Sequence, residues 1–320
     1  MAENNPITLA NVIAAAIQIP GIRVDREAFL REQFKGTDAV ALGSILASGP
    51  VAAGCDRDTL RKKADKVILG NAVISTGASF LAGLPGGWAM AVTIPTDLLQ
   101  FYGAALKTAQ ETAYLYGEPD LWEGDTPDEE RITNQLTLYI GVMLGVSGAA
   151  QTVRLTSSAL AQQAAAGKLP DKVSTKTFCY PVIRTVIRFF AKTLTKTSLV
   201  RGVSKIIPVI GGVVSGGITF ASLKPMGDRL KDTFDKAHFS YSDIEIRNDI
   251  RDIEEIAAKA EAEDADEEAE EEPETIEVLP GADEPVSGLD EIREAKKLLD
   301  DGIIDEEEFT DIKAKIISKM

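Results

Sequence analysis

Side chains able to do acid–base or nucleophilic chemistry are few in this chain of 320 residues. His238 is the single histidine, and no nucleophile or orienting carboxylate stands at a fixed spacing from it. Asp97 borders a long apolar stretch and has Gln100 nearby, a setting in which a carboxyl group can act as a buried acid. The same pair is typical of a helix N-terminus, and that interpretation is favoured. We therefore expect no catalytic site, and keep an enzyme using Asp97 or His238 as an alternative.

Residue clusters that bind metals or phosphates are also missing from the sequence. One histidine and two separated cysteines, Cys55 and Cys179, cannot build a His-rich or CxxC zinc site, and reduced thiols are expected. The acidic residues between Asp125 and Glu130 fit the first turn of a helix better than a calcium loop. The glycines of residues 83–87 lack the following Lys-Ser/Thr of a phosphate loop. No metal and no cofactor are predicted.

The elements that carry these side chains are predicted to be helices, because strand patterns are scarce. Four stretches combine a short polar side chain, able to accept from free amides of a first helical turn, with a Glu or Gln that can reach back. A proline at the first helical position, as at Pro127, has no N–H to leave unpaired. The sequence therefore predicts an all-α fold, a helical bundle. The four stretches are Thr96-Asp97 with Gln100, Thr126-Pro127 with Glu129, Ser242 with Glu245, and Asp305 with Glu308.

Three segments, 67–96, 132–153 and 206–223, are unusually apolar, and each is long enough to approach the span of a bilayer. The first is interrupted by Leu84-Pro85-Gly86-Gly87, which predicts the turn of a glycine-rich apolar hairpin at Pro85, Gly86 and Gly87. Small residues recur four apart, a spacing that lets two helix backbones approach closely. The favoured interpretation is tight packing inside a soluble core, and the alternative is a hairpin that enters one leaflet. The small pairs are Gly83/Gly87, Gly141/Gly145 and Gly212/Gly216.

Charge is distributed unevenly along the chain. The formal net charge is −16, yet residues 252–284 alone hold 16 acidic residues and one base, whereas residues 1–251 hold 24 acidic and 27 basic residues. The acidity therefore belongs to a linker, and the preceding body is slightly basic. The Ala/Glu-rich start of this linker suits an extension of the helix that begins near Ser242. After Pro273 we expect disorder, because like charges repel and little apolar surface can be buried.

A basic strip lies between Lys172 and Lys224, with nine bases and no acidic residue. Within it, four bases spaced by four residues form one row on a helix whose other positions are rich in Val, Ile and Phe. Such a pattern is typical of interfacial membrane binding, and about 1 kcal/mol per cation gives about 4 kcal/mol on an anionic surface. A solvated face, or loose pairing with the acidic linker, is the competing interpretation. Nucleic acid is disfavoured, because stacking aromatics are few and the linker repels phosphate. The row is Arg184, Arg188, Lys192 and Lys196.

The last 35 residues, 286–320, predict a short helical hairpin. Gly302 ends a Leu-rich first helix, Asp305 caps a second, and Ile304 and Phe309 are placed to form a hydrophobic staple. Two such helices bury too little surface to fold alone. We therefore expect this hairpin to pair with itself or with a protein partner through Leu298, Gly302, Ile304 and Phe309.

Both the tail and the body carry family resemblances. The tail resembles a SHOCT module, an interaction or oligomerisation element, in Leu289, Ile292, Leu298, Leu299, Gly302-Ile303-Ile304-Asp305, Glu308-Phe309 and Lys313. Residues 64–239 resemble the helical EcsC family, which implies no settled reaction and no catalytic residues. The EcsC-like motifs are Gly83-Leu84-Pro85-Gly86-Gly87, Ile94-Pro95-Thr96-Asp97, Tyr114-Leu115-Tyr116-Gly117 and Lys205-Ile206-Ile207-Pro208-Val209-Ile210-Gly211-Gly212. The run from Ile19 to Glu27 also stands out, without a chemistry attached to it.

Together these patterns predict four regions: an N-terminal helical region (1–63), an EcsC-like body (64–250), an acidic linker (251–285) and a SHOCT-like hairpin (286–320). The N-terminus lacks a basic segment followed by an apolar one, so no secretory leader is expected. The predicted function is a non-enzymatic, peripherally membrane-associated interaction or scaffold protein, cytoplasmic and attached to the inner membrane face. A fully soluble helical scaffold is the alternative.

Overall fold

The computed structural model describes residues 7–74, 94, 96–122, 128–166, 175–199 and 216–270, and within them it contains helices and no strand. The predicted all-α fold is thus confirmed. The chain divides into two compact units, Met1–Glu267 and Glu268–Met320, and the described helices lie in the first unit up to the last turn of α10. The helices are α1 (Leu9–Ala16), α2 (Arg26–Gln33), α3 (Ala39–Ser48), α4 (Arg57–Ile74), α5 (Thr96–Leu115), α6 (Glu129–Leu144), α7 (Ala149–Ala166), α8 (Thr175–Leu199), α9 (Gly216–Phe239) and α10 (Asp243–Glu270).

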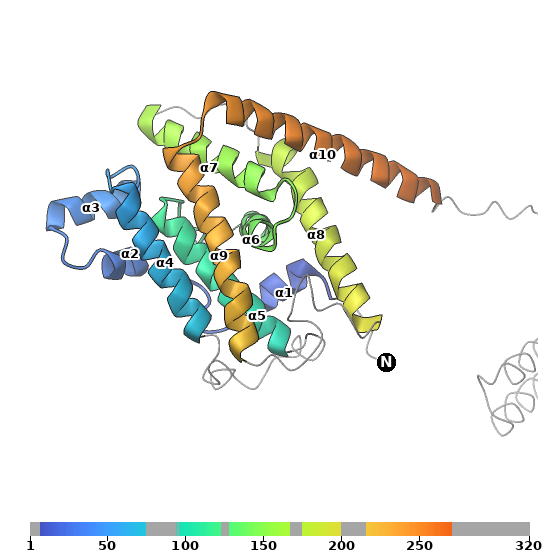
Figure 1. The fold of residues 1–320 in the computed structure, drawn as a ribbon, viewed down its shortest axis with the longest axis horizontal. Helices are drawn as coiled ribbons and strands as arrows, with labels where there is room; N and C mark the ends of the chain where they lie inside the picture. Colours follow the sequence, from blue (N-terminus) through green and yellow to red (C-terminus); the bar gives the residue numbers. More distant parts are fainter. Residues whose placement is uncertain are drawn as a thin grey trace, which may run out of the picture. The chain divides into compact units, whose positions relative to one another are not determined.

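The core is built around α5 and α9, which cross at the centre of the bundle (Figure 1). α5 packs on α1, α4, α6 and α9, whereas α9 packs on α4, α5, α6 and α7. Large aromatic side chains pack each of the two against a neighbour: Tyr102 of α5 meets Phe190 of α8 edge-on at 5.5 Å, and Phe234 of α9 meets Tyr139 of α6 edge-on at 5.5 Å. Their burial removes apolar surface from water, which is the main source of the bundle's stability.

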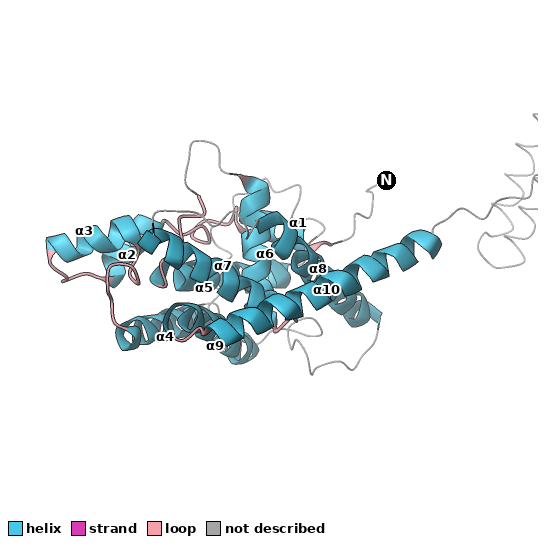
Figure 2. Ribbon diagram, turned by 90° about the horizontal axis from the view of Figure 1, so that it is seen from above, coloured by secondary structure: helices cyan, strands magenta, loops and turns pink. Residues whose placement is uncertain are grey.

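α4 and α9 lie side by side in Figure 2, and the colours of Figure 1 show that they run antiparallel. A ladder of ion pairs joins them, in which residue numbers rise along α4 as they fall along α9. Asp235 is almost fully buried, which alone would raise its pKa, but the guanidinium groups of Arg57 and Arg61 outweigh this and hold the pKa below its ordinary value. The ladder fixes the register of the two helices. Its pairs are Arg57–Asp235, Arg61–Asp232 and Asp65–Lys231.

Gly141, the first of the small-residue pair in the 132–153 segment, lies in the core, as the packing interpretation predicts, whereas Gly145 is exposed. A Cβ atom on Gly141 would lie 2.5 Å from Cγ2 of Val186 in α8 and 3.0 Å from Cβ of Ala149 in α7. Gly145 serves another purpose: it ends α6 in the left-handed region, at φ 75°. The segment is therefore two helices joined by a turn, α6 and α7, with their apolar faces buried by protein.

Adding one methyl group at Gly141 tests this close approach. We expect Gly141→Ala to lower the free energy of unfolding by about 2 kcal/mol, because the new atom overlaps Val186 in a packed interior. Urea denaturation monitored by circular dichroism measures the change. Gly43→Ala is the control, since Gly43 also lies inside a helix but a Cβ there meets no atom within 4 Å. Equal stability of both variants would mean that α6 and α8 are not in contact at this point.

Of the predicted helix N-caps, the one at α10 is confirmed and the one at α6 is wrong. At α10 the predicted reciprocal cap forms: the Ser242 backbone N–H donates to the Glu245 carboxylate, and the Glu245 N–H donates to the Ser242 hydroxyl. At α6 the predicted cap, Thr126, is wrong, because the carboxylate of Asp128 accepts from the Arg131 N–H instead. Asp128 stands two residues later and is an equally good cap, so α6 begins later than predicted.

The described helices cross two of the predicted region boundaries. α4 continues through the boundary at residue 63, and α1 packs on α5 and α6, so residues before and after it share one core. α10 continues to Glu270, as the Ala/Glu-rich start of the linker suggested. The boundaries of the four regions stay predictions. Outside the described residues lie the hairpin turn at Pro85, Gly86 and Gly87 and the tail positions Leu298, Gly302, Ile304 and Phe309.

Among the helices that the structure describes, none is both long enough and apolar enough to cross a membrane.

Candidate functional site

The predicted basic row lies on α8, and the structure shows what each side of this helix contacts. Its apolar side, which recurs with the helical period, packs on α6, α7 and α1 and is buried. The pattern that suggested a membrane-binding helix therefore serves the core on this side. The buried residues are Cys179, Val182, Ile183, Val186 and Phe190.

The other side of α8 carries the cations. Arg184 and Arg188 are half-buried and Lys192 is exposed, and the side chain of Lys196 lies outside the described residues. Two large apolar residues accompany them: Tyr180 is 58% exposed and Ile187 is 37% exposed. The Arg184 guanidinium lies 5.8 Å from the centre of the Tyr180 ring, within the range of a cation–π contact. We call this surface the α8 face, made of Tyr180, Arg184, Ile187, Arg188 and Lys192.

A cleft that the sequence did not predict lies at the start of α2, where the run from Ile19 to Glu27 is held in place. The buried side-chain amide of Gln110 in α5 organises it. The Gln110 amide nitrogen donates to the Ile22 carbonyl at 2.9 Å, and its oxygen accepts from the Val24 N–H at 3.2 Å. The same oxygen accepts from Nε1 of Trp122 at 3.0 Å. Gln110 thus satisfies backbone groups that would otherwise be buried without partners.

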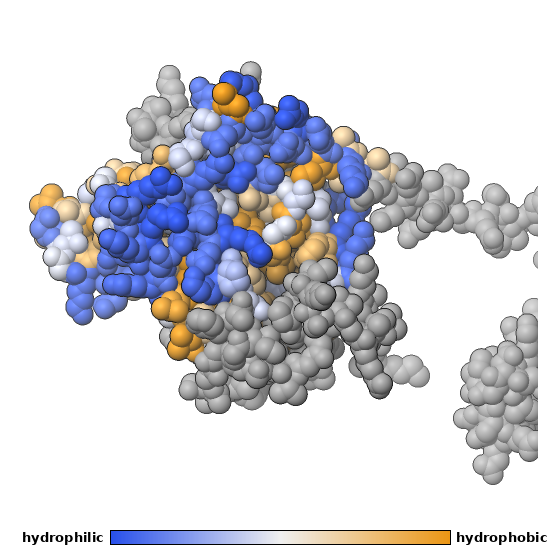
Figure 3. Space-filling model, in the orientation of Figure 1, coloured by the Kyte–Doolittle hydropathy of each residue, from blue (hydrophilic) through white to orange (hydrophobic). Residues whose placement is uncertain are grey.

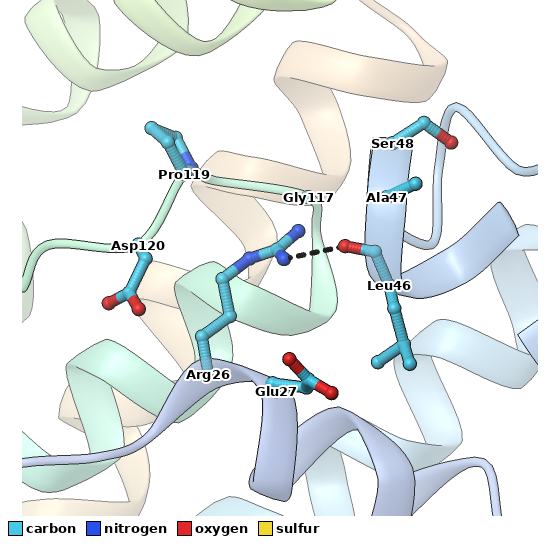
Figure 4. Close-up of a pocket in the computed structure, with 8 residues that line it drawn as sticks. All are labelled: Arg26, Glu27, Leu46, Ala47, Ser48, Gly117, Pro119 and Asp120. Carbon is cyan, nitrogen blue, oxygen red and sulfur yellow. Dashed lines mark hydrogen bonds between the residues drawn. The ribbon is translucent and has the colours of Figure 1, made fainter. Parts of the chain in front are cut away.

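Arg26 lines this cleft and ties three elements together (Figure 4). Its Nε donates to the Glu118 carbonyl at 3.0 Å and its Nη1 donates to the Leu46 carbonyl at 3.0 Å, at the end of α3. The cavity beside it has a volume of about 430 Å³, and a neighbouring one of about 710 Å³ shares Glu27 and Asp120 as lining residues. Since Arg26 is bound by carbonyl groups and Glu27 pairs with Arg31, these side chains hold the structure together rather than forming a reactive pair.

Glu118 is a buried acid next to this cleft that sequence reasoning also missed. Its carboxylate accepts from the Tyr139 hydroxyl at 3.3 Å and has no Lys or Arg partner among the described residues. Burial raises the pKa of Glu118 to about 7. The only local signal was a carboxyl residue between Gly117 and Pro119, directly after a run of buried aromatic residues.

The candidates for enzyme chemistry are not brought together in the described part of the chain. His238 stacks on the Tyr116 ring at 6.2 Å, and neither of its ring nitrogens has a hydrogen-bond partner among the described residues. Burial lowers the pKa of His238 to about 4, so the ring is neutral near pH 7. The side chain of Asp97 lies outside the described residues, and no group of three metal-ligating side chains occurs within them.

Comparison with known families finds a match in the tail. Residues 290–317 match the family described as the short C-terminal domain, SHOCT, which confirms the resemblance predicted from the Gly302-Ile303-Ile304-Asp305 motif. This match covers the tail alone, and no family match supports the EcsC resemblance of the body. Neither the curated proteins nor the solved structures contain a match to this chain. The chain thus carries a SHOCT module behind an all-α body.

Proposed function

We propose that this chain is a non-enzymatic adaptor that attaches peripherally to an anionic membrane surface, at the cytoplasmic face, through the α8 face. The observation that carries the proposal is the gathering of exposed Lys192 and half-buried Arg184 and Arg188 on the side of α8 opposite to its buried side, beside Tyr180 and Ile187. Cations attract acidic head groups, and tyrosine favours the boundary between head groups and acyl chains. The EcsC resemblance of residues 64–239 belongs to this proposal and is supported by its glycine and proline motifs alone.

The expected strength of attachment is modest. Three cations at about 1 kcal/mol each give about 3 kcal/mol, or roughly a hundredfold in affinity. Lys196 continues the row and adds about another kcal/mol if it reaches the same surface. Such a sum supports reversible attachment only, because nothing in the described residues spans a bilayer.

The SHOCT module strengthens this weak attachment if it joins copies of the chain. Two bodies linked through their tails bind the same surface together, and the second contact forms at a high effective concentration. The acidic linker gives the module reach, since its like charges repel. The tail therefore acts as an oligomerisation element, with Leu298, Gly302, Ile304 and Phe309 as contact residues.

Deleting residues 286–320 tests the function directly. We expect the shortened chain to have a lower mass by light scattering and to shift from the salt-washable membrane pool of fractionated cells to the soluble pool. The physical reason is the loss of the second attachment point. Ile304→Asp with Phe309→Asp in the full-length chain is the matched control, and should reproduce both effects without shortening the linker. An unchanged mass refutes self-association, and a full-length chain that is entirely soluble refutes membrane attachment.

A further inference from the structure

α3 is held on the body at few points. It packs mainly on α2, and Ile45 is its one buried residue. The helix carries no charged side chain, and apolar residues such as Val40, which is 85% exposed, reach the surface at the left of the body (Figure 3). Because so little of α3 is buried, its position depends on the contacts that its C-terminal end makes.

The end of α3 meets the body at Gly117 and Glu118. Gly49, which follows α3, lies so close to Gly117 that a Cβ atom on it would be 2.8 Å from the Gly117 Cα. The Arg26 guanidinium group bridges the same two segments, because it donates to the Leu46 carbonyl (Figure 4) and to the Glu118 carbonyl. This short stretch is therefore the point on the body at which α2 and α3 are both fastened.

The carboxyl group at this point is buried and has no cation to balance it among the described residues. Glu118 is 4% exposed, and its carboxylate accepts from the Tyr139 hydroxyl of α6. Besides burial, that hydroxyl and the Ser157 hydroxyl of α7 act on the pKa of Glu118, and both lower it less than burial raises it. The ionised form of such a group is stable only where water reaches it.

The titratable and charged groups around Glu118 do not compensate its charge. Arg26 of α2 binds the main-chain carbonyl of this residue rather than its carboxylate. Asp120, two residues on, is itself an acid and accepts from the Tyr114 hydroxyl of α5. Burial raises the pKa values of Tyr114 and Tyr139, so both phenols stay protonated over the range in which a carboxyl group ionises. An ionised Glu118 therefore has to move toward water.

We propose that Glu118 is a pH-sensitive latch, whose protonated carboxyl group keeps α2 and the end of α3 fastened to the body and whose ionisation loosens them. Solvation of the carboxylate requires the chain around Glu118 to move outward. This movement breaks the Arg26 bridge and separates Gly49 from Gly117, so the released end of α3 exposes its buried side. The latch belongs to the body and is independent of membrane attachment.

The ratio of loosened to fastened molecules should follow the ionisation of Glu118. Its pKa is about 7 when the side chain is buried and near the ordinary value of 4.5 when it is solvated. The loosened state therefore binds fewer protons, and rising pH favours it. Between pH 5.5 and about pH 7.5 this difference in pKa raises the ratio about twentyfold.

Amide hydrogen exchange of the full-length chain, followed by NMR, tests the latch. The Gly49 N–H donates to the Ile45 carbonyl and the Glu118 N–H to the Ala113 carbonyl, so each amide reports on one side of the fastening. We expect both protection factors to fall together, about twentyfold from pH 5.5 to about pH 7.5, and to stay below those of amides in α4 and α9. In Glu118→Gln both should stay nearly constant, and the urea midpoint checks that this variant is folded.

Two arginine variants test the bridge between the two amides. Arg26→Gln removes the bonds to the Leu46 and Glu118 carbonyls, so the Gly49 amide should already be as weakly protected at pH 5.5 as it is in wild type at about pH 7.5. Arg31→Gln is the matched control, since Arg31 is an exposed residue of the same helix that pairs with Glu27, and it should behave as wild type.

Three outcomes would overturn the latch. The first is constant protection of the Gly49 and Glu118 amides in wild type, and the second is an equal fall in Glu118→Gln. The third is protection equal to that of α4 and α9, because the whole body would then open at once. If Glu118→Gln does not fold, the wild-type pH dependence and the comparison of Arg26→Gln with Arg31→Gln decide the question.

Discussion

Replacing Arg184 and Arg188 together by glutamate should lower the partition coefficient on anionic vesicles about thousandfold. Each reversal changes the charge by two, and about 1 kcal/mol per charge near an anionic surface gives about 4 kcal/mol in total. Both side chains are half-buried on the side of α8 opposite to Val182 and Val186, and the urea midpoint of the double variant checks that the body stays folded. Vesicle flotation at low salt measures the effect.

A matched reversal on another helix separates a local effect from a change in net charge. Lys35→Glu with Lys62→Glu alters the total charge equally, and both residues are exposed, Lys35 just after α2 and Lys62 on α4. Since α8 packs on α1, α6 and α7 and not on these two helices, we expect partitioning within about threefold of wild type. Equal losses in the two double variants would show that only net charge matters, and that the α8 face has no special part in adhesion.

The free energy of unfolding of Glu118→Gln should rise relative to that of wild type as pH rises. Between pH 4.5 and about pH 8 the difference between the two chains should grow by about 3 kcal/mol in favour of the variant. The buried carboxyl group is protonated in the folded chain up to its pKa of about 7, whereas in the unfolded chain it ionises near its ordinary value of 4.5. Wild-type stability from this group is therefore complete below pH 4.5 and is lost as pH rises from 4.5 to 7. A neutral amide does not titrate, and it can keep a hydrogen bond with the Tyr139 hydroxyl.

Urea unfolding of wild type and Glu118→Gln at a series of pH values gives the difference directly. Because every other titrating group is present in both chains, subtracting the two curves isolates Glu118. Glu254→Gln is the control, since that side chain is exposed on α10 and its loss should leave the curve unchanged. A difference that stays constant between pH 4.5 and about pH 8 would mean that Glu118 is solvated or paired with a cation.

The helical periodicity of the sequence was enough to predict the fold class and to place the basic row on one side of a helix. A spacing of four residues puts Arg184, Arg188 and Lys192 together whatever the helix packs against. The periodicity could not reveal what covers the opposite side, because Val186 and Phe190 suit lipid and protein equally well. Only the folded chain shows that both are buried against neighbouring helices.

The cleft at the start of α2 could not be predicted from the sequence for a different reason. Gln110 holds backbone groups of Ile22 and Val24 that lie 88 and 86 residues away in the sequence, and a glutamine inside a helix carries no local sign of such a role. Glu118 is similar, since its partner Tyr139 belongs to the next helix. The predicted cap of α6 was wrong for a simpler reason. Thr126 and Asp128 are two acceptable caps in one stretch, and the local pattern does not choose between them.

Attachment to an anionic bilayer is measured most directly as the partition coefficient of the purified full-length chain on neutral vesicles and on vesicles rich in anionic lipid, each at low and at high salt. We predict strong binding only on anionic vesicles at low salt, with most of it lost at high salt, because the attraction between the α8 cations and the head groups is screened. Equal binding to neutral and anionic vesicles, or no binding to either at low salt, would contradict attachment through the α8 face.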